Sequence, residues 1–258
     1  MVNPPSVHVY TFCFNEQMMM PYFLRHYLPI ADKITIYDNY STDGSIDLAR
    51  VYDKVEIIQF DTNNELRDDI HTEIRNNCWK DCAEDIAIVC DLDEFLHHPN
   101  LPRFLKRFMA NKYTVAKPIA YDMVSHSLPI TSEQIYDEIK IGGRQPFYDK
   151  PVLFVPAHIE NMNFYPGGHH VLPEGQVKLY QNDLALKLLH YKFLSVEYVV
   201  GRRRLGESRR SEINRKNKWG VEYEQQYEAE TLKKMQECLA DGFNVLAGRY
   251  TQHEKTIV

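Results

Sequence analysis

The sequence predicts an α/β protein with a mostly parallel central sheet flanked by helices, and three observations support this. Short apolar stretches of strand character alternate with amphipathic stretches of helical period through the first half of the chain. Alternation at this spacing is typical of parallel strands joined by covering helices. The composition is that of an ordinary globular chain, since 44% of its 258 residues are hydrophobic and 26% are charged.

The strands are predicted from stretches rich in Val, Ile, Tyr and Phe. In chain order these cover 7–14, 33–37, 55–60, 85–90 and 113–117, with a further one at 150–155. The fourth ends in the unbroken apolar run IAIVC, which is typical of a strand covered on both faces. Helical periodicity occupies the intervening segments 16–28, 44–51, 66–82 and 101–109, and a last helix is predicted at 222–239.

Composition also excludes several classes of protein. The net charge of −6 disfavours a general nucleic-acid binder, and no apolar run is long enough for a membrane span. The chain has 5 cysteines, an odd number, and no Cys-x-x-Cys, so neither a disulfide framework nor a zinc ribbon is indicated. Cys78 and Cys82 lie four apart on a predicted helix, where two core cysteines are favoured over a metal site. We expect a reduced, cytoplasmic protein.

Acidic residues follow three of the first four predicted strands, at the sheet edge where α/β proteins bind ligands. Asp91 and Asp93 come directly after the fourth strand. Because these two residues lie two apart in what is expected to be an extended segment, both side chains point to the same side. Such carboxylates repel each other unless a cation lies between them, and Mg²⁺ or Mn²⁺ prefers oxygen ligands. The alternative is a solvated acidic turn. No Gly-x-Gly-x-x-Gly or Walker motif is present.

Three sequence blocks, in this order, resemble the GT-A glycosyltransferases, most closely the group around families 2 and 92. The blocks are FCFNE at 12–16, YDNYSTDGS at 37–45 and DLDEFL at 91–96. RNNCW at 75–79 and LLHYK at 188–192 extend the resemblance over most of the chain. It implies a GT-A fold with a smaller acceptor-side C-terminal part.

The resemblance also implies one GT-A domain over 1–258, with a nucleotide-binding half at 1–118 and an acceptor-side half at 119–195. A basic segment and the C-terminal helix make up 196–258. The implied reaction is metal-dependent transfer of a sugar from a nucleotide-diphosphate donor, expected to be UDP-linked, to an acceptor hydroxyl with inversion. The acceptor, a glycan, a lipid-linked sugar or a protein, is left open, as is the oligomeric state.

Individual site residues follow from the matching blocks. The resemblance places Asn15, Glu16 and Asp38 against the nucleotide and Arg75 toward the donor. It makes Asp93 a direct ligand of Mn²⁺ or Mg²⁺, Asp91 a ligand of the metal or the ribose, and His190 a further metal ligand. Two alternatives stay open, since Asp38 also suits a turn and helix cap and Arg75 suits a helix surface.

The segment 192–218 is basic in a chain that is acidic as a whole, because it holds nine Lys or Arg against three Glu, a balance of +6. It includes Arg202-Arg203-Arg204 and Arg209-Arg210. A solvated face is one interpretation. Nucleic-acid binding is disfavoured because no interleaved aromatic series is present. In a glycosyltransferase the segment could fold over the diphosphate, and we expect Lys192, Arg203 and Arg209 to contact phosphate.

An inverting enzyme also needs a general base on the acceptor. His169, Asp122 and Glu174 are candidates, and the sequence does not choose among them. His169 belongs to a predicted tight loop at 163–173, in which paired glycines precede paired histidines. His158, His169 and His170 are candidates for acceptor contact.

Three other functions suit a similar sheet with acidic residues at its edge. A sugar nucleotidyltransferase is disfavoured because FCFNE contains no glycine for a phosphate loop. A metal-dependent phosphoesterase and a non-catalytic nucleotide- or sugar-binding module stay open.

Overall fold

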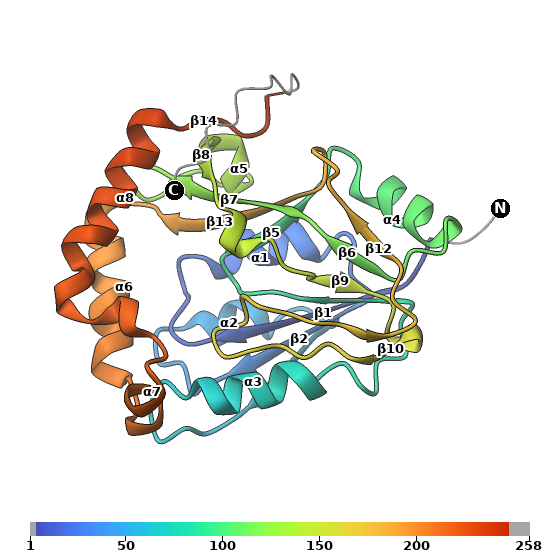
Figure 1. Cartoon of the computed structure of the whole chain (residues 1–258), viewed down its shortest axis with the longest axis horizontal. Helices are drawn as coiled ribbons and strands as arrows, with labels where there is room; N and C mark the ends of the chain where they lie inside the picture. Colours follow the sequence, from blue (N-terminus) through green and yellow to red (C-terminus); the bar gives the residue numbers. More distant parts are fainter. Residues whose placement is uncertain (1–3, 248–258) are drawn as a thin grey trace.

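Helices flank a central seven-stranded sheet in the computed structural model, which describes residues 4–247 (Figure 1). The strand order is β12-β6-β9-β4-β1-β2-β3. The bounds are β1 (Val7–Cys13), β2 (Lys33–Asp38), β3 (Val55–Gln59), β4 (Ile86–Val89), β6 (Val115–Lys117), β9 (Leu153–Phe154) and β12 (Leu179–Gln181). Only β9 runs antiparallel to its neighbours, β4 and β6. The predicted α/β class and the mostly parallel sheet are confirmed.

The predicted helices are present but shorter. They are α1 (Met20–Tyr27), α2 (Ser45–Ala49), α3 (Asp68–Asn77) and α4 (Leu101–Ala110). α1 starts late because Asn15 has a positive φ of 55° and the chain then turns, with the carbonyl of Glu16 accepting from Met19 and Met20. α3 ends at Asn77, so the predicted helix over 66–82 is too long at both ends. Asn100 caps α4 by accepting from the backbone of Arg103 at 3.0 Å.

A second sheet, not predicted from the sequence, has the order β14-β8-β7-β13-β5. Its strands are β5 (Glu94–His97), β7 (Ile119–Val124), β8 (Ile141–Arg144), β13 (Lys187–Phe193) and β14 (Phe243–Asn244). β5 begins immediately after Asp93, so Asp91 and Asp93 lie in a tight turn between β4 and β5. The expectation of an extended segment is therefore wrong, because the chain changes sheets there. β13 lies between β5 and β7, with His190 beside both Glu94 and Asp122.

Several smaller elements lie between these strands in the chain. They are α5 (Ile135–Glu138), η1 (Pro146–Tyr148), η2 (Pro156–His158), β10 (Ile159–Asn161) and β11 (Glu174–Gly175). The predicted tight loop at 163–173 is present. The backbone nitrogen of Gly168 donates to the carbonyl of Tyr165 at 2.8 Å and so closes a turn within this loop. Gly167 and Gly168 both have positive φ, which glycine adopts without strain.

The basic segment is helical and lies at one side of the molecule (orange to red in Figure 1). It comprises α6 (Val196–Arg209) and α7 (Glu212–Asn217), followed by η3 (Val221–Tyr223), η4 (Gln225–Tyr227) and α8 (Glu228–Asp241). A small apolar cluster that includes Phe193, Val199 and Met235 joins α6 and α8 to β13. Between residues 4 and 247, no helix is both long and apolar enough to cross a bilayer.

Candidate active site

The turn after β4 carries a buried network of charges. The carboxylate of Asp91 accepts a hydrogen bond from Arg75, and its second oxygen lies 3.4 Å from Nζ of Lys150. Lys150 also lies 2.8 Å from Oε1 of Glu94, whose side chain is 0% exposed. Glu94 in turn accepts from the backbone nitrogen of Asp91 at 3.0 Å. Burial alone would raise the pKa of Asp91, but Arg75 and Lys150 outweigh it and hold that pKa far below its usual range.

Asp93 takes part in a different arrangement, with His190 between two carboxylates. Nδ1 of His190 lies 2.9 Å from Oδ1 of Asp122, and Nε2 lies 3.5 Å from Oδ2 of Asp93. Burial would lower the pKa of His190, but Asp93 and Asp122 raise it well above its usual value. The imidazole therefore carries both protons when no cation is bound.

The pair of Asp93 and His190 fits a divalent cation. Asp122 holds the Nδ1 proton, which leaves Nε2 as the ligand atom, the arrangement usual for metal-binding histidines. Two ligands that bind one cation at about 2.1 Å lie roughly 3 Å apart or slightly more, and the 3.5 Å between Nε2 and Oδ2 is close to that. Asp91 is not a third member of this group, because among the described residues its carboxylate is not within 4.8 Å of both.

His169 and Lys192 meet around the ring of Tyr148. The rings of His169 and His190 lie 4.6 Å and 4.9 Å from that of Tyr148. Lys192 donates to the Tyr148 hydroxyl at 2.8 Å. Nδ1 of His169 is buried with no hydrogen-bond partner. Burial, then the nearby charge of Lys150, lowers the pKa of His169 to about 2, so its ring is neutral.

A pocket of about 610 Å³ opens at the carboxyl ends of β1, β2 and β3. Phe14 and Asn15 follow β1, Asn39 and Tyr40 follow β2, and Asp61 follows β3. The pocket is thus at the edge where α/β sheets bind ligands. Its full lining is Phe14, Asn15, Asn39, Tyr40, Thr42, Asp61, Asn64, Leu205, Ser208 and Arg209.

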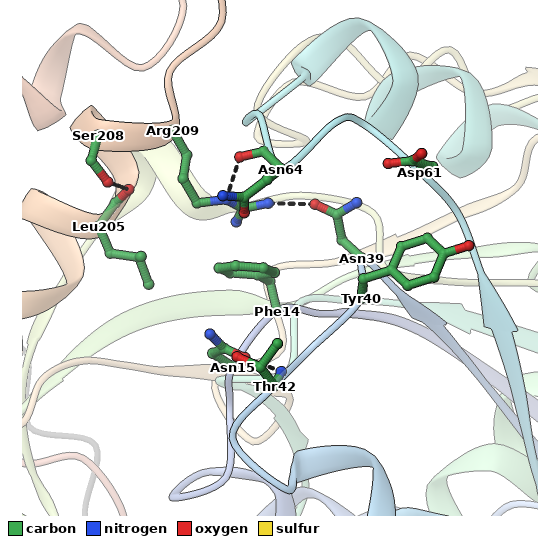
Figure 2. A pocket seen from close by; sticks show the side chains of 10 residues that line it. All are labelled: Phe14, Asn15, Asn39, Tyr40, Thr42, Asp61, Asn64, Leu205, Ser208 and Arg209. Carbon is green, nitrogen blue, oxygen red and sulfur yellow. Dashed lines mark hydrogen bonds between the residues drawn. The ribbon is translucent and has the colours of Figure 1, made fainter.

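The end of α6 closes this pocket. Figure 2 shows the guanidinium of Arg209 above the ring of Phe14, and its carbon lies 3.2 Å from the ring centroid. Arg209 also donates to the amide oxygen of Asn39 and, through Nε, to the carbonyl of Asn64 at 3.0 Å. A cation is therefore held over an aromatic floor at the mouth of the pocket.

Glu16 and Arg202 connect the pocket to the acidic turn. Arg202 donates to the carboxylate of Glu16, which directly follows the pocket residue Asn15. Burial raises the pKa of Glu16 to about 7 although Arg202 opposes this shift, and the charge of Asp93 raises it further. Glu16, Arg202 and Asp93 are therefore close enough to influence one another electrostatically.

Arg203, which was expected to contact phosphate, faces elsewhere. Its guanidinium donates to the hydroxyl of Thr231 and to the carbonyl of Glu224, on the α8 side of α6. Consecutive residues on a helix point about 100° apart, so only one of the three adjacent arginines can face the site. Arg202 occupies that position.

The other predicted residues are divided between the site and its surroundings. Asn15 lines the pocket and accepts from the backbone of Thr42 at 2.7 Å. Asp38 is buried and accepts from the backbone of Ser41 at 3.1 Å, the turn role that the sequence left open. Arg75 is buried rather than on a helix surface, and its guanidinium packs over Phe12 and against Gly168.

Three residues that were predicted on the acceptor side make none of the contacts described around Tyr148 and His190. Glu174 is exposed on β11, where its carboxylate accepts from Asn161 at 3.4 Å. His158 lies 3.1 Å from the amide oxygen of Gln176. The ring of His170 packs against Tyr165.

Sequence reasoning missed Phe14, Tyr148, Lys150 and Arg202. Lys150 offered a signal, because it precedes a strongly apolar strand and a buried lysine requires an anionic partner. Phe14 lies inside the first block of the resemblance and directly after a strand, which is the position of a ligand-binding residue.

No known protein-family model matches the chain, and no curated protein matches it in sequence. The solved structures that are similar to it include two of TarS from S. aureus. One covers 79% of this chain and 39% of its own, with a TM-score of 0.45 and 13% identity. The other, of TarS residues 1–349, covers 91% of this chain and 70% of its own, with a TM-score of 0.44 and 12% identity. The chain therefore spans about two fifths of the first of these structures.

Proposed function

We propose that this protein is a GT-A-like glycosyltransferase that moves a sugar from a nucleotide-diphosphate donor to an acceptor hydroxyl. One observation carries the proposal. The pocket at the carboxyl ends of β1, β2 and β3 includes Asn15, next to the Glu16–Arg202 ion pair, and that pair lies within electrostatic reach of Asp93, the partner of His190. A nucleotide in the pocket would direct its diphosphate toward that ion pair and its sugar toward the second sheet.

The pocket has the chemistry that a nucleoside requires. Phe14 offers an aromatic face for a base, and the amide nitrogen of Asn15 offers hydrogen-bond donors. Base stacking on an aromatic ring stabilises binding by about 1–3 kcal/mol. Arg209 lies over Phe14 in this structure, so a stacked base would displace the guanidinium from the ring, and the guanidinium could then exchange Asn39 for a phosphate oxygen.

Asp93 and His190 would hold Mn²⁺ or Mg²⁺, oriented by Asp122. When bound, such a cation neutralises the negative charge that develops on the departing diphosphate. Asp91 could join only by exchanging Arg75 or Lys150 for the cation. We therefore assign Asp91 to positioning these two cationic side chains.

His169 is the proposed general base for the acceptor hydroxyl. Nδ1 of its ring is buried and has no hydrogen-bond partner. The ring packs on Tyr148, which also contacts the ring of His190. Asp122 is instead engaged by His190, and Glu174 is exposed on β11. Burial, and then the charge of Lys150, keeps the pKa of His169 low, and the negative charge of a bound donor would raise that pKa.

Thermal unfolding with UDP, GDP or dTDP, each with and without Mn²⁺, tests the proposal. A ligand that binds only the folded chain raises the midpoint. We expect a rise with one nucleotide that is larger with Mn²⁺, loses its Mn²⁺-dependent part in Asp93→Ala and is retained in Asp53→Asn, an exposed control. No rise with any nucleotide would overturn the proposal.

Turnover of the matching nucleotide-sugar then separates the alternatives. Transfer that requires an added acceptor supports a glycosyltransferase. Rapid release of free sugar without acceptor indicates a phosphoesterase. Exchange between a nucleoside triphosphate and a sugar phosphate indicates a nucleotidyltransferase, and binding without turnover indicates a binding module.

A further inference from the structure

Three potential metal ligands gather at the opposite edge of the central sheet, near the amino ends of β1 and β4. They are Nδ1 of His8, Sγ of Cys82 and a carboxylate oxygen of Glu84, and these atoms all lie within 4.8 Å of one another. His8 is on β1, whereas Cys82 and Glu84 belong to the segment between α3 and β4. We propose that these three side chains form a zinc site, separate from the candidate active site and independent of the proposed function.

The hydrogen bonds around His8 favour Nδ1 as the ligand atom. Nε2 lies 2.8 Å from the hydroxyl oxygen of Thr35, and that hydroxyl donates to Glu56 at 3.3 Å. With the Thr35 proton directed to Glu56, Nε2 carries the imidazole proton, and the lone pair of Nδ1 accepts from the hydroxyl of Tyr10 at 2.9 Å. A second hydrogen bond that sets the tautomer in this way is usual for metal-binding histidines.

The ligand atoms of His8 and Glu84 face each other directly. Oε2 of Glu84 lies 3.1 Å from Nδ1 of His8. A cation between the two would bind both atoms, and it would displace the Tyr10 hydroxyl from Nδ1 or take it as a further ligand.

The spacing and the ligand chemistry fit zinc. Tetrahedral zinc with nitrogen, oxygen and sulfur ligands at about 2.0–2.3 Å has ligand–ligand separations of roughly 3.4–3.6 Å. The separations here are 3.1 Å from Nδ1 to Oε2 and 3.5 Å from Sγ to Oε2. A thiolate and a carboxylate together balance the charge of Zn²⁺, and a thiolate ligand favours zinc over Mg²⁺.

The site would link the segment after α3 to the first strand. Three protein ligands leave a fourth position, which water or the hydroxyl of Tyr10 can take, because that hydroxyl lies 2.9 Å from Nδ1. Cys82 and Glu84 are half-buried, so the ion can enter from solvent. The thiol proton of Cys82 is released to solvent when zinc binds.

Titration of the metal-free protein with Co²⁺, followed by competition with Zn²⁺, tests the site. Co²⁺ bound to a thiolate gives a sulfur-to-metal charge-transfer band that oxygen and nitrogen ligands do not give. We expect one equivalent of Co²⁺ to produce this band and Zn²⁺ to abolish it. Absence of the band would overturn the proposal.

Variants assign the band to these residues. Cys82→Ser should abolish it, whereas Cys78→Ser, which removes the thiol four residues earlier, should retain it. Asp93→Asn should also retain it, which separates this site from the active site. Thr35→Val should weaken Zn²⁺ binding by about 10- to 100-fold, because the His8 ring loses its orientation.

If circular dichroism shows that Cys82→Ser does not fold, Glu84→Gln replaces it, because the amide preserves the shape and removes the charge. We expect it to weaken Zn²⁺ binding at least tenfold. A charge-transfer band that survives Cys82→Ser, or unchanged Zn²⁺ affinity in Glu84→Gln, would contradict the assignment.

Discussion

Arg202 donates to the carboxylate of Glu16, and this ion pair joins the basic helix α6 to the segment that follows β1. Glu16 directly follows the pocket residue Asn15, and the charge of Asp93 influences both members of the pair. In the proposed complex, Arg202 would face the diphosphate of the donor.

Arg202→Met is therefore expected to weaken donor binding. A hydrogen bond to a charged group contributes about 1.5–3 kcal/mol, which corresponds to roughly a 10- to 150-fold rise in the KM for donor. Arg203→Met is the matched control, because Arg203 faces Thr231 and Glu224. It should lower the unfolding midpoint and leave the KM for donor unchanged. The reverse pattern in steady-state kinetics would show that the two arginines have been assigned the wrong way round.

Phe14→Leu is expected to weaken nucleotide binding by about 1–3 kcal/mol, because the stacking surface is lost. Calorimetric titration with the nucleoside diphosphate measures this directly. Phe147 provides a comparison, since it is 68% exposed and packs against His169. Phe147→Ala should leave nucleotide affinity unchanged and raise the KM for acceptor. Equal loss of nucleotide affinity in both variants would contradict the separation of donor and acceptor sides.

Asp122→Asn tests the role of His190. Asp122 holds Nδ1 of the imidazole at 2.9 Å, and loss of such a partner typically weakens metal binding by about 10- to 100-fold. We expect weaker Mn²⁺ binding by electron paramagnetic resonance, with metal-free nucleotide affinity preserved. Unchanged Mn²⁺ affinity would exclude His190 as a ligand oriented by Asp122.

His169→Ala should lower turnover and leave donor affinity nearly intact, because the proposed base acts on the acceptor. Loss of a general base typically costs about 10²- to 10⁴-fold in rate. His170→Ala is the neighbouring control, and we expect near-normal turnover. A comparable loss of donor affinity in His169→Ala would rule out the role of a base.

The stability of the fold is expected to fall in mild acid, partly because of His26. Burial lowers the pKa of this histidine from 6.5 to about 4, and its Nε2 donates to the carbonyl of Leu96 at 3.0 Å. The unfolded chain takes up the proton near pH 6.5 and the folded chain only near pH 4. The contribution of neutral, buried His26 to the free energy of unfolding is therefore complete above pH 6.5 and is lost as the pH falls toward 4. It amounts to at most about 3 kcal/mol.

Denaturant unfolding at pH 7 and pH 4.5 measures this effect. His26→Gln should lose less stability between the two pH values than the unmodified chain, whereas His158→Gln, at an exposed position, should not differ from it. An identical pH dependence in His26→Gln would show that burial of His26 is not a cause.

The sequence predicted six of the seven strands of the central sheet, all except β12, and the polar and acidic residues that follow strands β1 to β4. It did not predict the second sheet, whose strands gain their stability from pairing across the fold. The expected extended segment at Asp91 and Asp93 was wrong for the same reason, since the start of β5 depends on its pairing with β13.

The sequence by itself determined the α/β class and the acidic edge, because hydrophobic periodicity and strand ends are local properties of the chain. Only the tertiary structure decided the partners of each charge. Lys150 reaches Asp91 across 59 residues and Arg209 reaches Asn39 across 170. Pairs so distant in the chain leave no local pattern, because their geometry arises only when the two sheets and α6 pack together.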